Sequence, residues 1–333
     1  TAMVAVSFGS YASAAVADNE DWIKPFAVLI LLVMTGLNVV GSQAVAKAQT
    51  VVVIVVVGIL TVFSIATLSN LDLDLLAFSG YPSFADIVSS IALTFFAFLG
   101  FGVITFTAKD LADPQRQLPK AVYLALAIAT VVYVAVALGV FGTLTVDEVI
   151  DSGGTALAVA AEPVLGSAGY WLMSVTALFA TAGATNSGLY PAAGLGDEMA
   201  VVGQFPPMMG RRVGGRAAVG IVVTAIAAIV LAVFFDLNAI ASIGSAVALI
   251  VFTLVTFGHF RIRHETGAQG WLLIVANLAT VIVLASFTVT TLVNEPGTAI
   301  ALVAIVVVSL ALDLTWKNRR DKTARKAGES AGR

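Results

Sequence analysis

Apolar runs recur along the whole chain, and the short stretches between them hold most of the charged and turn-forming residues. Ten such runs can be delimited, and most approach the ~20 residues that a helix needs to cross a bilayer. They cover residues 1–16, 26–40, 48–69, 87–107, 121–144, 168–190, 217–235, 238–258, 271–293 and 296–312. The pattern predicts an all-α, polytopic bundle of about ten transmembrane helices, the first two of them short.

Composition supports a membrane protein. Hydrophobic residues make up 59% of the 333-residue chain and charged residues only 11%, whereas soluble domains carry about 25% charged residues. So little charge cannot cover the surface of a soluble protein of this size. The sequence has no cysteine and only two histidines, His259 and His264, which excludes thiolate and zinc sites. We expect no cofactor, no nucleic-acid partner and no catalytic set, and therefore no enzyme.

The sign of the charge alternates from one connection to the next. One set of connections holds Lys47, Lys109, Arg116, Lys120, Arg211, Arg212, Arg216, Arg261 and Arg263, and seven more basic residues follow residue 316. The other set holds only Lys24 of the 17 basic residues, and carries Asp18, Glu20, Asp21, Asp72, Asp74, Asp147, Glu148, Asp151, Asp236 and Glu295. Basic loops stay in the cytoplasm. We therefore expect an integral protein of the plasma or cytoplasmic membrane with a cytoplasmic C-terminal tail.

The two ends of the chain carry further expectations. The sequence starts at Thr1, without a methionine and already inside an apolar run, and no basic segment of a signal peptide precedes it. We expect upstream sequence to be missing. Residues 317–333 read KNRRDKTARKAGESAGR and are predicted to be a solvated, disordered tail, with binding to anionic lipid as the alternative.

Residues 95–102 read FFAFLGFG, which places Gly100 and Gly102 inside the uncharged run 87–107. Each glycine weakens a helix by about 1 kcal/mol relative to alanine. Two interpretations compete: a neighbouring helix packs closely on the glycines, or the helix unwinds and its backbone binds a substrate. Four phenylalanines surround the glycines, and they supply more bulk than a close helix crossing needs. This favours the second interpretation.

The same run is followed by AKDLADPQRQLPKAV at 108–122, where we expect Pro119 to open the next helix. Together the two stretches resemble the sixth span and following loop of the amino acid–polyamine–organocation (APC) transporters, with Asp110 in the usual Glu place and Asp113–Pro114 in place of Asn-Pro. LNVVGSQAVAKAQTVVV at 37–53 resembles the link between the family's fourth and fifth spans, and LNAIASIGSAVALIVFTLV at 237–255 resembles its tenth span.

On this correspondence the ten runs are spans three to twelve, and two N-terminal spans are missing. The family fold consists of two five-helix repeats of inverted topology, with the substrate between the broken first and sixth helices. The resemblance implies that residues 1–82 are the remainder of the first repeat and that 83–260 form the complete second repeat. Residues 261–316 would be two C-terminal helices, before the basic cytoplasmic tail at 317–333.

The resemblance also implies site residues on the broken helix. Phe96 would form an aromatic wall or gate, and ordinary packing is its alternative role. The carbonyls around Ala97 and Leu99 would accept hydrogen bonds from a substrate amino group. Gly100 and Gly102 would mark the discontinuity beside them.

Three candidates lie on other runs. Tyr11 stands where related transporters have a polar aromatic residue, and its alternative is an interfacial tyrosine. Asn186 lies in the polar run TAGATNSGLYP with Thr185 and Ser187; these groups contact substrate or a sodium ion, or they hydrogen-bond between helices. Ser245 shares a helical face with Ser242, and back-bonding to the i−4 carbonyl is the alternative for both.

The predicted function is secondary active transport of a small molecule, an amino acid or related amine, with H⁺ or Na⁺ as candidate coupling ions and the lipid bilayer as the other partner. None of the ten runs contains Asp, Glu, Lys or Arg. Gly102 stands where many relatives carry Glu, and residues 51–60 lack the Lys of some proton-coupled relatives. A neutral or zwitterionic substrate is therefore expected. The alternative is a non-transporting scaffold or the inactive fragment of a truncated transporter gene.

Overall fold

The structure is a computed structural model. It describes residues 1–16, 19–40, 43–77, 82–106, 111–210, 212–213, 216–289 and 296–331. Within these ranges it leaves out the side chains of residues 40, 43–48, 85, 89, 92–93, 103, 106, 190, 192–193, 197, 209–210, 212–213, 216–218 and 317–331. Asp18, Lys109, Asp110, Arg211 and Glu295 lie outside these residues, so the expectations placed on them stay predictions. The chain divides into two compact units, each described by itself. Unit 1 comprises Thr1–Tyr81, Gly100–Asp197 and Gly210–Leu237, and unit 2 comprises Pro82–Leu99, Glu198–Met209 and Asn238–Arg333.

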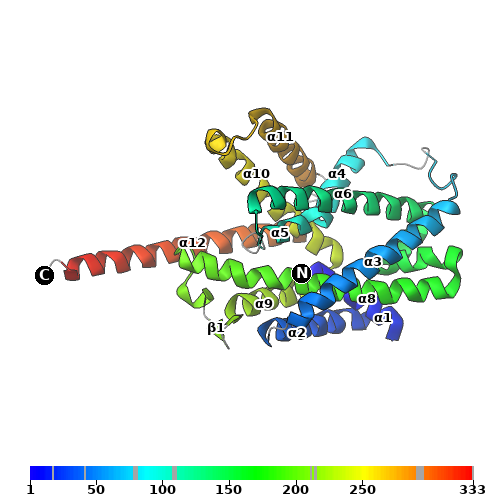
Figure 1. Cartoon of the computed structure of the whole chain (residues 1–333), viewed down its shortest axis with the longest axis horizontal. Coiled ribbons are helices and arrows are strands. Elements are labelled where there is room, and N and C mark those ends of the chain that lie inside the picture. The colour runs from blue at the N-terminus through cyan, green and yellow to red at the C-terminus, as the bar shows by residue number, and fades with distance from the viewer. Residues whose placement is uncertain are drawn as a thin grey trace. The chain divides into compact units, whose positions relative to one another are not determined.

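Unit 1 is built almost entirely from helices (Figure 1). In it α1 packs on α2, α2 on α9, and α3 on α6. Its elements are α1 (Ala2–Val16), η1 (Glu20–Trp22), α2 (Ile23–Val40), α3 (Gln43–Ser69), α5 (Val103–Phe106), α6 (Pro114–Phe141), α7 (Val146–Ser152), η5 (Gly153–Thr155), most of α8 (Ala156–Val201), the two-residue strands β1 (Arg212–Val213) and β2 (Arg216–Ala217), and α9 (Ala218–Phe234).

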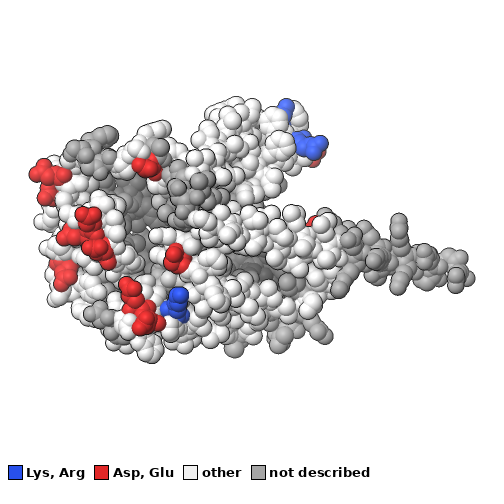
Figure 2. Space-filling view, turned by 180° about the vertical axis from the view of Figure 1, so that it is seen from behind, with Lys and Arg blue, Asp and Glu red and all other residues white. Residues whose placement is uncertain are grey.

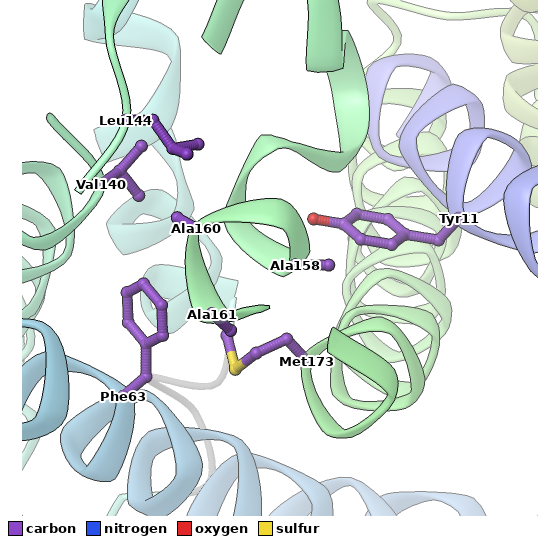
Figure 3. Close-up of a cluster of buried hydrophobic side chains, with 8 residues drawn as sticks. All are labelled: Tyr11, Phe63, Val140, Leu144, Ala158, Ala160, Ala161 and Met173. Atoms are coloured by element: carbon purple, nitrogen blue, oxygen red, sulfur yellow. The ribbon is translucent and has the colours of Figure 1, made fainter. Parts of the chain in front are cut away.

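The core of unit 1 is a buried cluster of apolar side chains drawn from four helices and from the turn after α6. Figure 3 shows Phe63 and Met173 beside Ala161, and Tyr11 directed toward the segment that carries Ala158. Alanines on α8 keep the neighbouring helices close, which small residues commonly do in membrane bundles. The cluster comprises Tyr11, Phe63, Val140, Leu144, Ala158, Ala160, Ala161 and Met173.

Unit 2 has a separate core, formed by Ala246, Leu249, Phe287 and Leu302. In it α4 packs on α11. The indole N–H of Trp316 donates a 2.9 Å hydrogen bond to the Gly203 carbonyl, which connects α12 to the stretch after α8. Its elements are α4 (Phe84–Thr94), the first part of η3 (Phe95–Gly102), η6 (Pro207–Gly210), α10 (Leu237–Thr266), α11 (Gly270–Phe287) and α12 (Pro296–Ala331).

Seven helices of the described chain are long and apolar enough to cross a membrane. They lie within Glu20–Val39, Gln49–Ser69, Pro114–Phe141, Val146–Val201, Leu237–Thr266, Gly270–Phe287 and Pro296–Trp316. The predicted runs 1–16 and 217–235 fall on the shorter helices α1 and α9, and 87–107 falls on α4, η3 and α5. The all-helical membrane architecture is therefore confirmed, whereas the count of ten spans stays a prediction.

Two helix limits differ from the sequence-based expectation, and one break lies close to a predicted limit. α6 begins at Pro114 instead of Pro119, because Asp113 caps it and a proline suits the first helical position. α8 is interrupted at Gly166, whose positive φ of 69° lies outside helical geometry, and this break lies two residues before the predicted run 168–190. α12 continues as a helix to Ala331 where a disordered tail was expected, since Lys, Arg, Ala and Glu in this stretch are good helix formers.

Acidic loops of unit 1 gather at one end (Figure 2). The backbone N–H of Asp72 donates to the Gly142 carbonyl at 2.9 Å, which holds the loop after α3 against the end of α6. η5, which follows the acidic helix α7, contacts α1. Arg116 and Lys120 lie at the opposite end of α6, a 28-residue helix of about 42 Å. The basic connection that holds Arg116 and Lys120 is thus separated from the acidic connections at the other end of α6 by about the length of a membrane span.

Candidate functional site

The α-helix that begins at Phe84 changes its winding at the FFAFLGFG sequence. Ser83 caps α4 by accepting a hydrogen bond from the Asp86 N–H, and α4 ends at Thr94. The eight residues Phe95–Gly102 then form the 3₁₀ helix η3, and α-helical geometry returns in α5. Runs of 3₁₀ helix longer than about four residues are uncommon, and one inside a helix often marks a functional hinge or strain. The predicted discontinuity is present, but the backbone is tightened rather than unwound.

Among the described residues, no close helix packing is seen at the two glycines of η3. A Cβ atom added at Gly100 or Gly102 would meet no heavy atom within 4 Å among the described residues. In contrast, one added at Gly9 would overlap the Ile23 carbonyl oxygen of α2, and one at Gly139 would overlap the Thr67 hydroxyl of α3. Close approach is therefore served by glycines elsewhere in the chain. At η3, the property of glycine that matters is its weak preference for the α-helix.

The first two residues of η3 pack against α10. The ring of Phe96 lies over Gly244, where an added Cβ atom would overlap the ring and lie 2.6 Å from its Cδ2. The ring of Phe95 meets that of Phe252 edge to face, with 6.0 Å between centroids. Packing is what the structure shows for Phe96, and its role as a substrate wall stays a prediction. Ala97 is exposed and Leu99 is half-buried.

Tyr11 belongs to the core of unit 1. Its side chain is 7% exposed and packs with Ala158 and Met173 in the cluster of Figure 3, with Tyr170 at the edge of that cluster. Such burial argues against the interfacial alternative, because interfacial tyrosines keep their polar end in water. A substrate contact for Tyr11 is untested and stays a prediction.

Asn186 has a partner on another helix. Asn38 of α2 donates a 2.6 Å hydrogen bond from its amide to the side-chain oxygen of Asn186 on α8. Thr185, which is fully buried, donates to the Thr181 carbonyl one turn earlier at 2.8 Å. The polar run of α8 therefore includes one hydrogen bond between helices and one within its own helix, the two uses common in membranes.

Ser245 is fully buried on α10, next to the glycine that Phe96 covers, and Ser242 is 2% exposed. Every buried side-chain nitrogen or oxygen that the structure describes has a hydrogen-bond partner. The eight predicted site residues thus fall into two sets. Tyr11, Gly100, Gly102 and Asn186 belong to unit 1, and Phe96, Ala97, Leu99 and Ser245 to unit 2. Within unit 2 the structure brings Phe96 and the neighbourhood of Ser245 together.

Two residues at these contacts were missed by sequence reasoning. Gly244 is one of 29 glycines, and the signal that singles it out is the phenylalanine that covers it. Asn38 lies in an apolar run in which a lone amide is a polar group needing a partner, and this signal was available in the sequence. Of the residues that the structure describes, no three His, Asp or Glu side chains come together as a metal site.

The short acidic helix α7, which lies outside the apolar runs, begins with a hydrogen-bonded carboxylate, that of Glu148. The Glu148 carboxylate accepts hydrogen bonds of 2.8 Å from the backbone N–H of Thr145 and from its hydroxyl. The first of these, together with the 3.3 Å hydrogen bond that the Glu148 N–H donates to the Thr145 hydroxyl oxygen, forms the capping box of α7. Since hydrogen bonds to a carboxylate favour its charged form, they hold the pKa of Glu148 below its ordinary value. The cap fixes the start of a short acidic helix between α6 and α8.

Comparison with known proteins adds independent support. The sequence profile of the amino acid permease family matches residues 1–313. An uncharacterized protein of Methanocaldococcus jannaschii is 32% identical over 241 residues, 72% of this chain and 55% of that protein. The inner membrane transport protein YbaT of Escherichia coli is 29% identical over 325 residues, 97% of this chain and 75% of that protein. The branched-chain amino acid permease BcaP of Lactococcus lactis is 29% identical over 201 residues, 57% of this chain and 41% of that protein.

The chain spans about half the length of the first of these relatives and three quarters of the second. The family and its named members are permeases and transporters, not enzymes. With seven helices able to cross a bilayer, the chain is an integral membrane protein. The resemblance to the APC transporters is confirmed: the chain belongs to the amino acid permease family.

Proposed function

We propose that this permease is a secondary active transporter that moves amino acids or related small amines across the membrane by alternating access. The observation that carries the proposal is the eight-residue 3₁₀ segment η3, which interrupts the predicted membrane span 87–107 in a chain matched by the permease family over residues 1–313. Irregular backbone survives in a membrane only where protein buries it or where it lines a cavity. A segment of this kind is suited to holding a polar substrate.

In this proposal the backbone of η3 supplies the polar contacts. Hydrogen bonds of a 3₁₀ helix have poorer geometry than those of an α-helix, so its carbonyls are well disposed to accept a further donor. The carbonyls around Ala97 and Leu99 accept hydrogen bonds from the substrate ammonium group, and the Phe96 ring covers its apolar part. A substrate contact is less well supported for the other three candidates, Tyr11, Asn186 and Ser245, since each is packed or hydrogen-bonded within its own unit.

The charge pattern supports a neutral or zwitterionic substrate. The apolar runs contain no Asp, Glu, Lys or Arg, and η3 carries no carboxylate beside its glycines. A cationic side chain held inside the membrane would need an opposite charge to offset its desolvation. The coupling ion, H⁺ or Na⁺, is proposed from the family resemblance alone.

Two architectural points belong to the same proposal. Residues 83–260, from α4 to most of α10, form one complete five-helix repeat, and residues 1–82 belong to the other repeat of inverted topology. The compact units are defined by contacts and the repeats by correspondence to the family, so one division does not test the other. The basic connections and the tail face the cytoplasm, as the positive-inside rule requires.

Uptake of radiolabelled amino acids tests the proposal, with the protein encoded by the complete reading frame placed in proteoliposomes under H⁺ or Na⁺ gradients. Neutral, cationic and anionic amino acids compete, and Phe96→Ala is compared with Phe84→Ala, which removes a ring that is 80% exposed at the start of α4. Competition by neutral amino acids, with uptake lost only in Phe96→Ala, is the expected result. Competition by cationic compounds alone contradicts the neutral substrate, and absence of uptake under every gradient supports the non-transporting alternative.

A further inference from the structure

Gly244 of α10 is the position on which the Phe96 ring lies. A Cβ atom at residue 244 would overlap Cε2 of the ring, and would lie 2.6 Å from Cδ2 and 3.5 Å from Cζ. Carbon atoms in contact are normally about 3.5–4.0 Å apart. Glycine is therefore the one residue type that leaves the ring where the structure has it, because every other residue type carries a Cβ atom.

The contact of Phe96 with Gly244 is one of two contacts between the start of η3 and α10. Phe95 meets Phe252 of α10 and packs against the core of unit 2 beside Leu249. Residues 244 and 252 lie eight positions apart, which is about 12 Å along a helix. Two successive residues of η3 are thus laid on α10 at two separate points. These two contacts hold the start of η3 on α10. An atom added at residue 244 would therefore move the Phe96 ring, because the ring can rotate about its side-chain bonds.

We propose that Gly244 positions the Phe96 ring and, through it, sets the size of the amino acid side chain that the transporter accepts. This inference rests on the proposed function, because it takes the Phe96 ring as one wall of the substrate site. One side of the ring is covered by Gly244, and the side chain as a whole is only half-buried. A methyl group at residue 244 displaces the ring toward its uncovered side, and this displacement narrows the space left for a large substrate side chain.

Gly244→Ala tests the inference, with Gly258→Ala as its matched control. Gly258 lies on the same helix, and a Cβ atom there meets no heavy atom within 4 Å among the described residues. The measurement is uptake of leucine and alanine in proteoliposomes, resolved into KM and kcat. Gly244→Ala is expected to raise the KM for leucine by up to about tenfold, with a much smaller change for alanine and little change in kcat. Gly258→Ala is expected to change neither KM.

A second pair of variants separates the ring from the rest of the helix. In Phe96→Ala the atoms that the new methyl group would overlap are gone, so adding Gly244→Ala to it is expected to leave the leucine-to-alanine KM ratio unchanged. A further rise of the ratio in that background overturns the inference. The double variant is also expected to fold into the membrane to the same extent as the single variant Phe96→Ala. If Gly244→Ala prevents folding both in the unmodified protein and in Phe96→Ala, the methyl group acts through helix packing and the inference is wrong.

The failure of this inference is distinguishable from the failure of the proposed function. Suppose that the unmodified protein takes up neutral amino acids and that Gly244→Ala has the same leucine-to-alanine KM ratio as the unmodified protein. The proposed transport function is then supported, and the positioning role of Gly244 is wrong. If the unmodified protein takes up none, the proposed function falls and the inference falls with it.

Discussion

Asn38 and Asn186 are 148 residues apart in sequence, and a 2.6 Å hydrogen bond joins their side chains across α2 and α8. Asn38 also donates to the Met34 carbonyl of its own helix at 2.8 Å. Both residues are half-buried, in helices that are otherwise strongly apolar. An amide in this setting lacks water as a replacement partner, so the pair fixes how α2 and α8 face each other within unit 1.

The first prediction concerns this pair. A double-mutant cycle with Asn38→Ala and Asn186→Ala is expected to give a coupling energy of about 0.6 kcal/mol, and at most about 1.7 kcal/mol, as for other hydrogen bonds between membrane helices. The measurement is the free energy of unfolding in mixed micelles. Thr35→Ala serves as the control, because the hydroxyl of Thr35 donates its hydrogen bond to the Leu31 carbonyl of the same helix. If Asn38→Ala and Asn186→Ala are simply additive, the hydrogen bond has no role in the packing.

The second prediction concerns the contact of α6 with α3. A Cβ atom at Gly139 would overlap the Thr67 hydroxyl and lie 3.1 Å from its Cβ, and Thr67 is fully buried. Gly139→Ala is therefore expected to lower the free energy of unfolding by about 1–3 kcal/mol, the usual cost of overpacking. Gly58→Ala on α3 is the control, since a methyl group there meets no described atom within 4 Å. Equal effects of the two substitutions would refute the close approach at Gly139.

The third prediction is a pH dependence. The pKa of Glu148 is lowered in the folded protein by the backbone N–H of Thr145, and next by its hydroxyl. The stabilisation from this group is therefore present above the unfolded-state pKa and is lost as the pH falls through the lower, folded-state pKa. Glu148→Gln should lower the melting temperature at neutral pH and make no difference in acid. A melting temperature that differs equally at both pH values would show that the carboxylate charge is not involved.

The helices of this protein follow closely from its sequence, because a bilayer demands long apolar stretches with internally satisfied backbone. Their ends were harder to predict. α6 starts at Pro114, and not at Pro119, because Asp113 caps it. The helical extension of α12 to Ala331 was missed because residues 317–333 were expected to be a solvated, disordered tail, whereas the Lys, Arg, Ala and Glu in this stretch favour a helix.

The site was predictable only in part. An interrupted helix at 95–102 was predicted from the four phenylalanines around Gly100 and Gly102, because the two glycines alone also fit close helix packing. The partners of Phe96 and Asn186 depend on which helices meet, and a sequence pattern does not carry that information. The contact of Gly244 with Phe96 and the pairing of Asn38 with Asn186 therefore emerged only from the structure.

The central claim is that the 3₁₀ winding of η3 serves transport rather than packing. Alanine at Gly100 and Gly102 favours an α-helix by about 1 kcal/mol per position, and there is room for both methyl groups among the described residues. The most direct measurement is amino acid uptake beside the free energy of unfolding for Gly100→Ala/Gly102→Ala, with Gly36→Ala, which also has room for a methyl group, as the control. We predict that uptake falls by at least about tenfold, the effect of roughly 1.4 kcal/mol, while stability stays equal or rises. Undiminished uptake in a protein of equal or greater stability would contradict the claim.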